Sequence, residues 1–264
     1  MWDVAMRKSA LLVGLITLSA MTSPATADGF QPAWNASPYY AWTGCYLGGN
    51  GGGIWSRTDT TWVSEIAGPA PGPLSPVQPR GSISSSGWSL GGQLGCDYQF
   101  NSNWIIGIRG MWDGSNATGS RDISLPNIGN FTSGQTDHTD LRSFETVTGR
   151  LGFLVTRTAM LYGVGGVAWV QNRVAVTEAQ GLGGVGPALG EIFTSSNTRT
   201  GYDVGAGASW MLVPNWELWV EYDHMGFGTK TIAMRGEGPF TGFVAGFDQT
   251  LNVDKVLVGL NWRF

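Results

Sequence analysis

The sequence predicts an all-β protein, an eight-stranded antiparallel up-and-down transmembrane β-barrel, from three observations. Only 13% of the 264 residues are charged, whereas roughly a quarter are charged in an ordinary soluble domain. The chain contains eight separate apolar segments, and in several of them apolar residues recur at alternate positions, which is typical of strands with one apolar face. The connections between these segments are alternately short and long, as in membrane-spanning barrels.

The composition disfavours several other classes of protein. Aromatic residues make up 12% of the chain, which disfavours intrinsic disorder. Past residue 30, no uncharged apolar run reaches the length of about 18 residues that a transmembrane helix needs. The net charge of −4 provides no basic stripe for the phosphates of a nucleic acid.

Residues 1–27 have the three parts of a secretory signal peptide. The basic pair Arg7 and Lys8 precedes a short apolar run, and small residues end the segment at Ala27. This order is typical of a cleaved export signal. We expect cleavage between Ala27 and Asp28.

The sequence leaves open whether translation starts at Met1 or Met6. After cleavage, residues 28–41 are predicted to form a periplasmic N-terminal lead, and residues 42–264 the barrel.

Eight strands are predicted in order along the chain. They cover 42–55, 87–100, 103–113, 144–156, 158–171, 200–212, 215–226 and 251–264. Each has about 11 to 14 residues, close to the 9–11 that a tilted strand needs to cross a bilayer. The second, sixth, seventh and eighth segments alternate between apolar and polar or small residues, whereas the fifth leaves the facing of its side chains open.

Tight turns and long loops connect the predicted strands. The turns lie at Asn101-Ser102, around Arg157 and at Pro214-Asn215, and the loops are 56–86, 114–143, 172–199 and 227–250. Short periplasmic turns and long extracellular loops are the pattern of outer-membrane barrels. Both chain ends are then expected on the periplasmic side. The alternative, a soluble ligand-binding barrel, is disfavoured because the second face of several strands consists mostly of Gly, Ser and other small residues.

Aromatic residues are predicted to form two interfacial girdles, since such rings favour the membrane–water boundary. The periplasmic set is Trp42, Tyr46, Tyr98, Phe100, Trp104, Tyr162, Trp210, Trp216, Trp262 and Phe264. The opposite set is Trp55, Trp88, Trp112, Trp169, Tyr202 and Tyr222.

Glycines are expected in the lumen, opposite large side chains, because an eight-stranded barrel has a narrow interior. These positions are Gly48, Gly91, Gly95, Gly107, Gly152, Gly205, Gly207 and Gly259.

The same alternation directs most strand charges into the lumen. The predicted charge network consists of Asp97, Arg109, Arg150, Asp203, Glu217, Glu221, Asp223 and Lys255. Because buried charges must be paired, we expect salt bridges centred on Arg109 and Arg150. Such a network predicts a polar plug, and the alternative is a narrow ion path.

Two cysteines and two histidines remain as candidates for chemistry. Cys45 and Cys96 are expected near each other at the periplasmic rim; that compartment permits a disulfide, but the uncertain register leaves the bond open. His138 is placed in a loop and His224 at a strand end, and no hydroxyl is identifiably aimed at His224. We therefore predict no catalytic, cofactor-binding or metal-binding residues.

Several segments resemble a known family. They are WTGCYLGGNGGG at 42–53, NWIIGIRG at 103–110, TGRLGFLV at 148–155, MLYGVGGVAW at 160–169, TGYDVGAGASW at 200–210, NWELWVEYDHMGFG at 215–228 and VLVGLNWRF at 256–264. In this order they resemble the Omp25/Omp31-like outer-membrane proteins of alphaproteobacteria. The chain departs from the family pattern at Cys45, Cys96 and Arg109.

The resemblance implies an abundant eight-stranded barrel of the cell outer membrane, loosely called porin-like. The last strand resembles the signal that the barrel-assembly machinery recognises, with Val258, Leu260, Trp262 and Phe264 as its apolar residues. We expect a monomer among outer-membrane lipids and lipopolysaccharide, with a structural and surface-exposed role in the Gram-negative envelope and no cofactor. Alternative hypotheses are a narrow channel for small solutes and, third, a lipid-modifying enzyme that uses His224.

Overall fold

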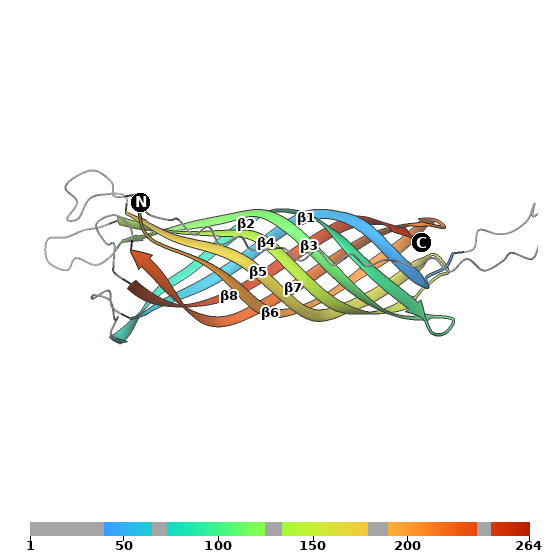
Figure 1. Ribbon diagram of the computed structural model, residues 1–264, viewed down its shortest axis with the longest axis horizontal. Helices are drawn as coiled ribbons and strands as arrows, with labels where there is room; N and C mark the ends of the chain where they lie inside the picture. Colours follow the sequence, from blue (N-terminus) through green and yellow to red (C-terminus); the bar gives the residue numbers. More distant parts are fainter. Residues whose placement is uncertain (1–39, 65–72, 125–133, 179–189, 237–243) are drawn as a thin grey trace, which may run out of the picture. The chain divides into compact units, whose positions relative to one another are not determined.

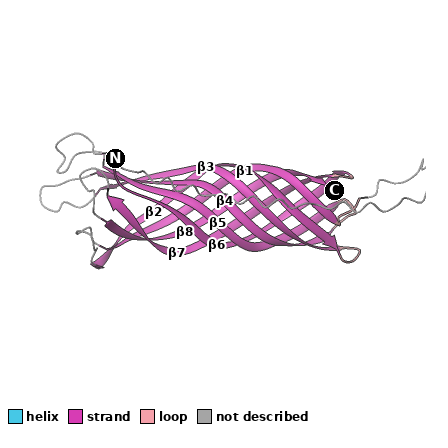
Figure 2. Cartoon of the chain, viewed as in Figure 1, coloured by secondary structure: helices cyan, strands magenta, loops and turns pink. Residues whose placement is uncertain are grey.

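The computed structural model describes residues 40–64, 73–124, 134–178, 190–236 and 244–264. Eight strands form one closed antiparallel barrel in which each strand pairs with its neighbours in the sequence and β1 pairs with β8 (Figures 1 and 2). The strands are β1 (Gly44–Ser64), β2 (Pro73–Gln99), β3 (Trp104–Ser124), β4 (Gly134–Leu154), β5 (Ala159–Glu178), β6 (Gly190–Val213), β7 (Trp216–Gly236) and β8 (Val244–Arg263). The eight-stranded up-and-down prediction is therefore confirmed.

The described residues contain no helix that is long and apolar enough to cross a membrane. The predicted signal peptide, 1–27, and most of the lead, 28–41, lie outside the described residues.

Both chain ends of the barrel meet where β1 pairs with β8. Cys45 and Phe264 exchange two backbone hydrogen bonds, of 3.2 and 3.0 Å. The three tight turns, at 100–103, 155–158 and 214–215, lie at this same end of the barrel (Figure 1). We call it the short-turn end and the opposite one the long-connection end.

The strands are much longer than the sequence predicts, with 20 to 27 residues each. They occupy most of the predicted loops 56–86, 114–143, 172–199 and 227–250, and only 65–72, 125–133, 179–189 and 237–243 lie outside the described residues. The loop bounds are therefore wrong. A strand that leaves the lipid loses its apolar outer face, so these polar extensions resemble loops in sequence.

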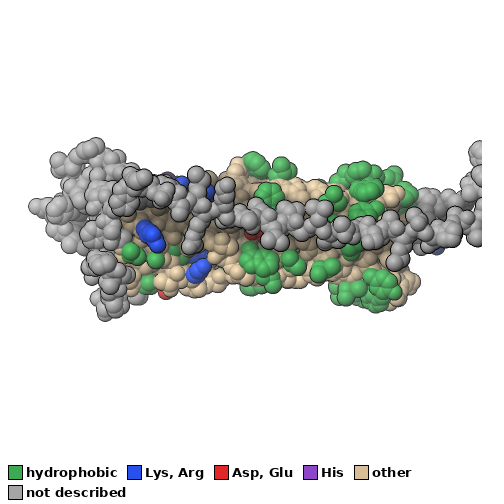
Figure 3. All heavy atoms as spheres, viewed as in Figure 1, with side chains coloured by type: hydrophobic (Ala, Val, Ile, Leu, Met, Phe, Trp, Pro, Cys, Tyr) green, Lys and Arg blue, Asp and Glu red, His purple; other side chains and the backbone are tan. Residues whose placement is uncertain are grey.

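The side-chain pattern inverts partway along the strands. On β8, Val256, Val258 and Leu260 face outward near the short-turn end. Toward the other end the apolar residues face inward, with Leu251 and Val253 fully buried. The barrel therefore has an apolar band around its short-turn half, while Lys and Arg side chains lie mostly over the other half (Figure 3).

Three aromatics predicted for the periplasmic girdle lie in the interior instead. Trp42 and Tyr46 are 1% exposed and Tyr162 is 5% exposed. Tyr46 and Tyr162 have inward-facing positions in the strand alternation, so proximity to a strand end was misleading. Outward-facing aromatics such as Trp104 and Trp262 do lie at the edge of the apolar band.

The prediction of lumen glycines opposite large side chains is confirmed. A Cβ atom at any of the eight predicted positions would collide with an interior side chain. At Gly95 and Gly207 the colliding groups are the rings of Tyr46 and Tyr162, and at Gly259 it is the Trp219 ring. Glycines in the barrel wall therefore leave the space that the large interior side chains occupy.

Cys45 and Cys96 are cross-strand partners on β1 and β2. They form a disulfide with a sequence separation of 51 residues. Cys96 has an exposed, outward-facing position close to the short-turn end.

We predict that Gly95→Val prevents folding, because the added side chain must occupy the space of the Tyr46 ring. Overpacking typically costs about 1–3 kcal/mol, and here the neighbouring backbone blocks relief. The matched control is Gly110→Val, because Gly110 faces outward and a Cβ atom there would make only an ordinary 4.0 Å contact with the Thr146 carbonyl oxygen. Migration of unboiled protein on a detergent gel measures the folded fraction. Equal folded fractions for the two variants would contradict the prediction.

Candidate functional site

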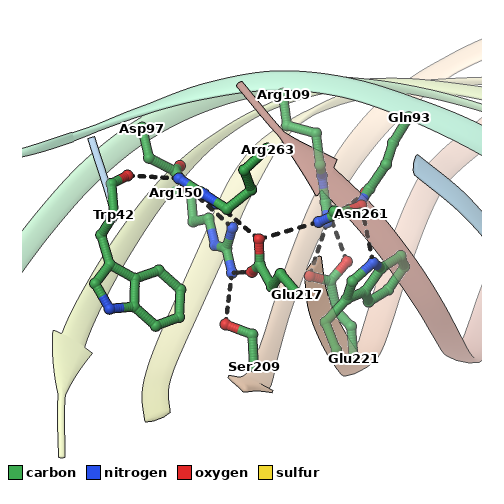
Figure 4. Close-up of polar contacts among 11 residues, drawn as sticks. Trp42, Gln93, Asp97, Arg109, Arg150, Ser209, Glu217, Glu221, Asn261 and Arg263 are labelled. Atoms are coloured by element: carbon green, nitrogen blue, oxygen red, sulfur yellow. Dashed lines mark hydrogen bonds and ion pairs between the residues drawn. The ribbon is translucent and has the colours of Figure 1, made fainter. Parts of the chain in front are cut away.

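The innermost site at the short-turn end is a charged layer around Glu217. Its carboxylate accepts hydrogen bonds from Arg150 at 3.0 Å and from Arg263 at 2.7 Å. Asp97 contacts the same two guanidinium groups at 3.3 and 3.0 Å (Figure 4). Two acids and two bases therefore balance inside the barrel. Ser209 completes the layer by accepting a hydrogen bond from Arg150.

A second layer lies next to it, formed by Arg109 and Glu221. The guanidinium donates two hydrogen bonds to the carboxylate, at 2.9 and 2.7 Å. This bidentate geometry is the strongest form of an arginine–carboxylate pair. Gln93 contacts both Arg109 and Asn261, and Asn261 donates to Glu217, so the two layers are joined by amides (Figure 4).

A third layer contains Lys255, which donates to Asp113 at 2.7 Å. Both side chains are fully buried. Asp203 and Asp223 are buried at the same depth in the strand register. Neither carboxylate oxygen of Asp203 has a hydrogen-bond partner among the described residues. All eight residues of the predicted network are therefore interior, but Asp203 and Asp223 do not join its ion pairs.

Two members of the network were absent from the sequence prediction, namely Arg263 and Asp113. Arg263 has the same inward parity as Lys255 and Asn261, and Asp113 the same parity as Arg109. The alternation of side chains therefore indicates that both residues face inward. Both lie near the ends of predicted strands, where the direction of a side chain is harder to assign.

Trp42, which precedes β1, closes the mouth of the barrel at the short-turn end. The indole of Trp42 donates to the carbonyl of Arg157 at 3.0 Å, and the Trp42 carbonyl accepts a hydrogen bond from Arg263. Trp42 packs in an apolar cluster with Ile105 and Met160. The charged layers are thus covered by a buried ring.

An apolar cluster covers the charged layers on their other side. It consists of Ile54, Ala117, Leu141, Phe144, Ala168, Val170, Met225, Phe227, Leu251 and Val253. The Lys255 ammonium lies 5.6 Å from the centre of the Phe144 ring, where the charged and apolar layers meet. Farther along, Arg199 contacts Gln249, and a second cluster includes Phe193 and Phe247. Buried side chains therefore occur along the whole length of the described interior.

The two histidines lie outside this interior network. His224 contacts Asp254 at 2.8 Å, and Tyr222 donates to the same carboxylate at 2.6 Å. His138, predicted in a loop, belongs to β4, and its ring nitrogen contacts the Thr177 hydroxyl at 3.2 Å. Within the described ranges, no group of three or more His, Cys, Asp or Glu side chains could hold a metal ion.

An exposed ion pair on β1 contrasts with the buried ones. Arg57 lies 3.3 Å from Asp59, and both side chains are largely accessible to water. A hydrogen bond from Ser82 is the largest cause that lowers the pKa of Asp59; slight burial opposes it and Arg57 adds to it. Asp59 is therefore ionised at neutral pH.

A closed barrel with an apolar outer band and a packed polar interior defines the class of outer-membrane β-barrel proteins. The family model described as "Outer membrane protein beta-barrel domain" matches residues 10–264. The chain belongs to this family.

Individual proteins show the same relationship. The chain is 28% identical over 265 residues to the 31 kDa outer-membrane immunogenic protein of Brucella melitensis, covering 97% of this chain and 100% of that protein. The protein of the same description from Brucella suis matches equally. The resemblance to the Omp25/Omp31-like family is therefore confirmed.

Solved structures also match the chain. Ail, the attachment invasion locus protein of Yersinia pestis, has 15% identity and a TM-score of 0.36, with 84% of this chain and 99% of that chain covered. The outer membrane protein OprG of Pseudomonas aeruginosa has 13% identity and a TM-score of 0.42, with 84% and 97% covered.

We predict that Glu217→Gln destabilises the barrel strongly, because it leaves two buried guanidinium groups with Asp97 as their one remaining carboxylate partner among the described residues. Breaking a buried ion pair costs about 3–5 kcal/mol. The matched control is Asp59→Asn, which removes an arginine partner at the exposed pair and should change stability by less than about 0.5 kcal/mol. Denaturant unfolding of folded protein in detergent micelles measures both values. Similar losses for the two variants would show that the interior network is not stabilising.

Proposed function

We propose that this protein is a structural barrel of the outer membrane whose interior is sealed, with its activity confined to its outer surfaces. The observation that carries the proposal is the series of three interior barriers. They are the Trp42 cap, the layers of paired charges and the apolar cluster around Phe144. An ion would have to lose its hydration to pass the apolar cluster, and this is costly without a partner.

The narrow-channel alternative requires the network to rearrange. Arg150, Arg263 and Glu217 bind one another across the lumen from β4, β8 and β7. A continuous water path would have to separate these groups or displace the cap. The packing thus supports a plug that fixes the barrel walls together.

The proposed role is not enzymatic. The hydrogen bond that His224 makes among the described residues is to Asp254, whose same oxygen atom also accepts from Tyr222. This arrangement supplies no hydroxyl activated by the histidine, which the acyl-transfer hypothesis needs.

The proposal also includes the orientation of the barrel in the membrane and the molecules that contact its outer surface. We infer that the short turns face the periplasm and that the long connections face the outside, as is general for this class. Val258, Leu260, Trp262 and Phe264 face outward on β8, where the assembly machinery can contact them. The apolar band contacts outer-membrane lipids, including lipopolysaccharide, around a monomer.

We predict that purified protein in a planar lipid bilayer gives no large, steady conductance. Steady current steps would contradict the sealed interior only if they arise in this lumen. Asp203→Asn and Asp248→Asn provide that test, since Asp203 is buried inside and Asp248 is on the outer surface, beside Thr231. Steps whose ion selectivity changes in the first variant but not in the second would establish the channel hypothesis instead.

We predict that protein extracted from outer membranes begins at Asp28, because residues 1–27 have the parts of a cleaved export signal. N-terminal sequencing measures the start directly. Replacing Ala27 with a bulky residue should retain the precursor length. A mature protein that keeps the basic pair Arg7 and Lys8 would contradict the cleavage.

A further inference from the structure

A polar hollow with basic side chains lies on the outer surface of β4, β5 and β6. Arg142, Gln171, Arg173, Ser196 and Thr198 are among the residues that line it. Lys230 borders it from β7, where its ammonium group donates to the Thr198 carbonyl at 3.1 Å. We call these six residues the basic hollow.

Its residues form a row across four neighbouring strands. Gln171 pairs in register with Thr198, and Arg142 stands next to that pair, between Leu141 and Ser143. Adjacent strands are about 4.8 Å apart, so the backbones of Arg142 and Lys230 are separated by roughly 14 Å. Their long side chains can both reach a small group held over the middle of the row.

Arg142 and Lys230 both lie where the strand pairing of the barrel wall is irregular. Arg142 is the extra residue of a β-bulge, because the register with β5 shifts between Leu141 and Ser143. Bulges commonly redirect a side chain or expose backbone groups. Between β6 and β7 the ladder is interrupted from Thr194 to Tyr202, and Lys230 lies opposite this gap. The segment 195–201 therefore offers backbone groups and hydroxyls that no β7 partner occupies in the ladder.

The charges of the hollow favour an anion. Arg142 is exposed and makes no hydrogen bond or ion pair with any described residue. Three acids also lie on β4. Asp137 is buried and pairs with Arg80. Asp140 pairs in register with Arg173, and Glu145 pairs in register with Trp169 and accepts a hydrogen bond from Ser143. Arg142 and Lys230 are thus the two cations left to bind a ligand.

The position of the hollow along the barrel axis indicates which anion it can meet. Gln171 lies two residues beyond Trp169 on β5, and Thr198 lies four residues beyond Tyr202 on β6. Trp169 and Tyr202 belong to the aromatic girdle predicted at this side of the apolar band, and Tyr202 is 53% exposed. At about 3.3 Å per residue along a tilted strand, the hollow is roughly 5–10 Å beyond these two rings. Lipid phosphates occupy this level, between the hydrocarbon and bulk water.

We propose that the basic hollow binds a phosphate group of an anionic glycolipid of the outer leaflet, with Arg142 and Lys230 as the charged ligands. This inference rests on the proposed orientation, in which the long-connection end faces outside. Phosphate oxygens accept from guanidinium and ammonium groups, and such charge-assisted hydrogen bonds are the stronger ones. Hydroxyl groups of Ser196 and Thr198 can complete the oxygen contacts.

The test compares three probes with the folded full chain in detergent micelles. They are lipid A with both phosphates, the same lipid after dephosphorylation, and inorganic phosphate, with binding followed by native mass spectrometry. We expect the phosphorylated lipid to bind at least about 10-fold more weakly to the Arg142→Gln, Lys230→Gln double variant. The dephosphorylated lipid should bind weakly to wild type and variant alike.

The matched control is the Arg57→Gln, Arg235→Gln double variant, which removes two exposed positive charges elsewhere on the same half of the barrel. It should lose less than about twofold. Equal losses in both variants, or equal binding of the dephosphorylated lipid, would overturn the proposal. So would inorganic phosphate binding as tightly as the lipid, since the ligand is then free phosphate.

Heat-modified gel migration verifies that each variant is folded. The conductance of the barrel is a separate measurement. Failure of lipid binding in a non-conducting barrel overturns this inference alone, whereas a conducting barrel overturns the proposed function.

Discussion

Glu217 accepts hydrogen bonds from two guanidinium groups that come from β4 and β8, and it does so inside a barrel of only eight strands. Such an interior is wide enough for side chains but not for their hydration water. Most of the buried charges therefore pair across the lumen, whereas Asp203 and Asp223 form no ion pair among the described residues. The walls must be free of side chains where the large groups pass. At Gly95 and Gly259, an added Cβ atom would collide with a large interior side chain, so these positions must be glycine. The paired charges and the wall glycines therefore depend on each other, because the glycines leave the space that the large interior side chains occupy.

Each strand passes from lipid into water, and these two environments require opposite placements of apolar and polar side chains. In the apolar band, lipid outside requires apolar outward residues, and the lumen contains the charges. Beyond the band, water outside requires polar outward residues, so apolar side chains such as Val174 and Ile232 turn inward and form a core. The change in phase explains how strands of 20 or more residues fold although a membrane needs about half that length.

The sequence predicts strand number, connectivity and most of the lumen charges, because period-2 alternation is strong wherever lipid and lumen differ in polarity. The outer halves of the strands were missed, since there the contrast is weaker and its phase is reversed. Trp42 was misplaced because its position depends on hydrogen bonds to Arg157 and Arg263, which join residues 115 and 221 positions apart. The Cys45–Cys96 bond depended on the register, which hydropathy fixes only to within about two residues.

The proposed seal of the interior determines where function can reside. Residues such as Arg150 and Lys255 are held on several sides, and removing one partner leaves a buried charge, so the lumen can change little without loss of the fold. The outer surface has no such restriction, and its irregularities are free to serve binding. The bulge at Arg142 and the interrupted ladder near Lys230 occur at one level, just outside the aromatic edge. A structural barrel with an external lipid contact requires such a place on its outer wall, where irregular pairing leaves cations exposed.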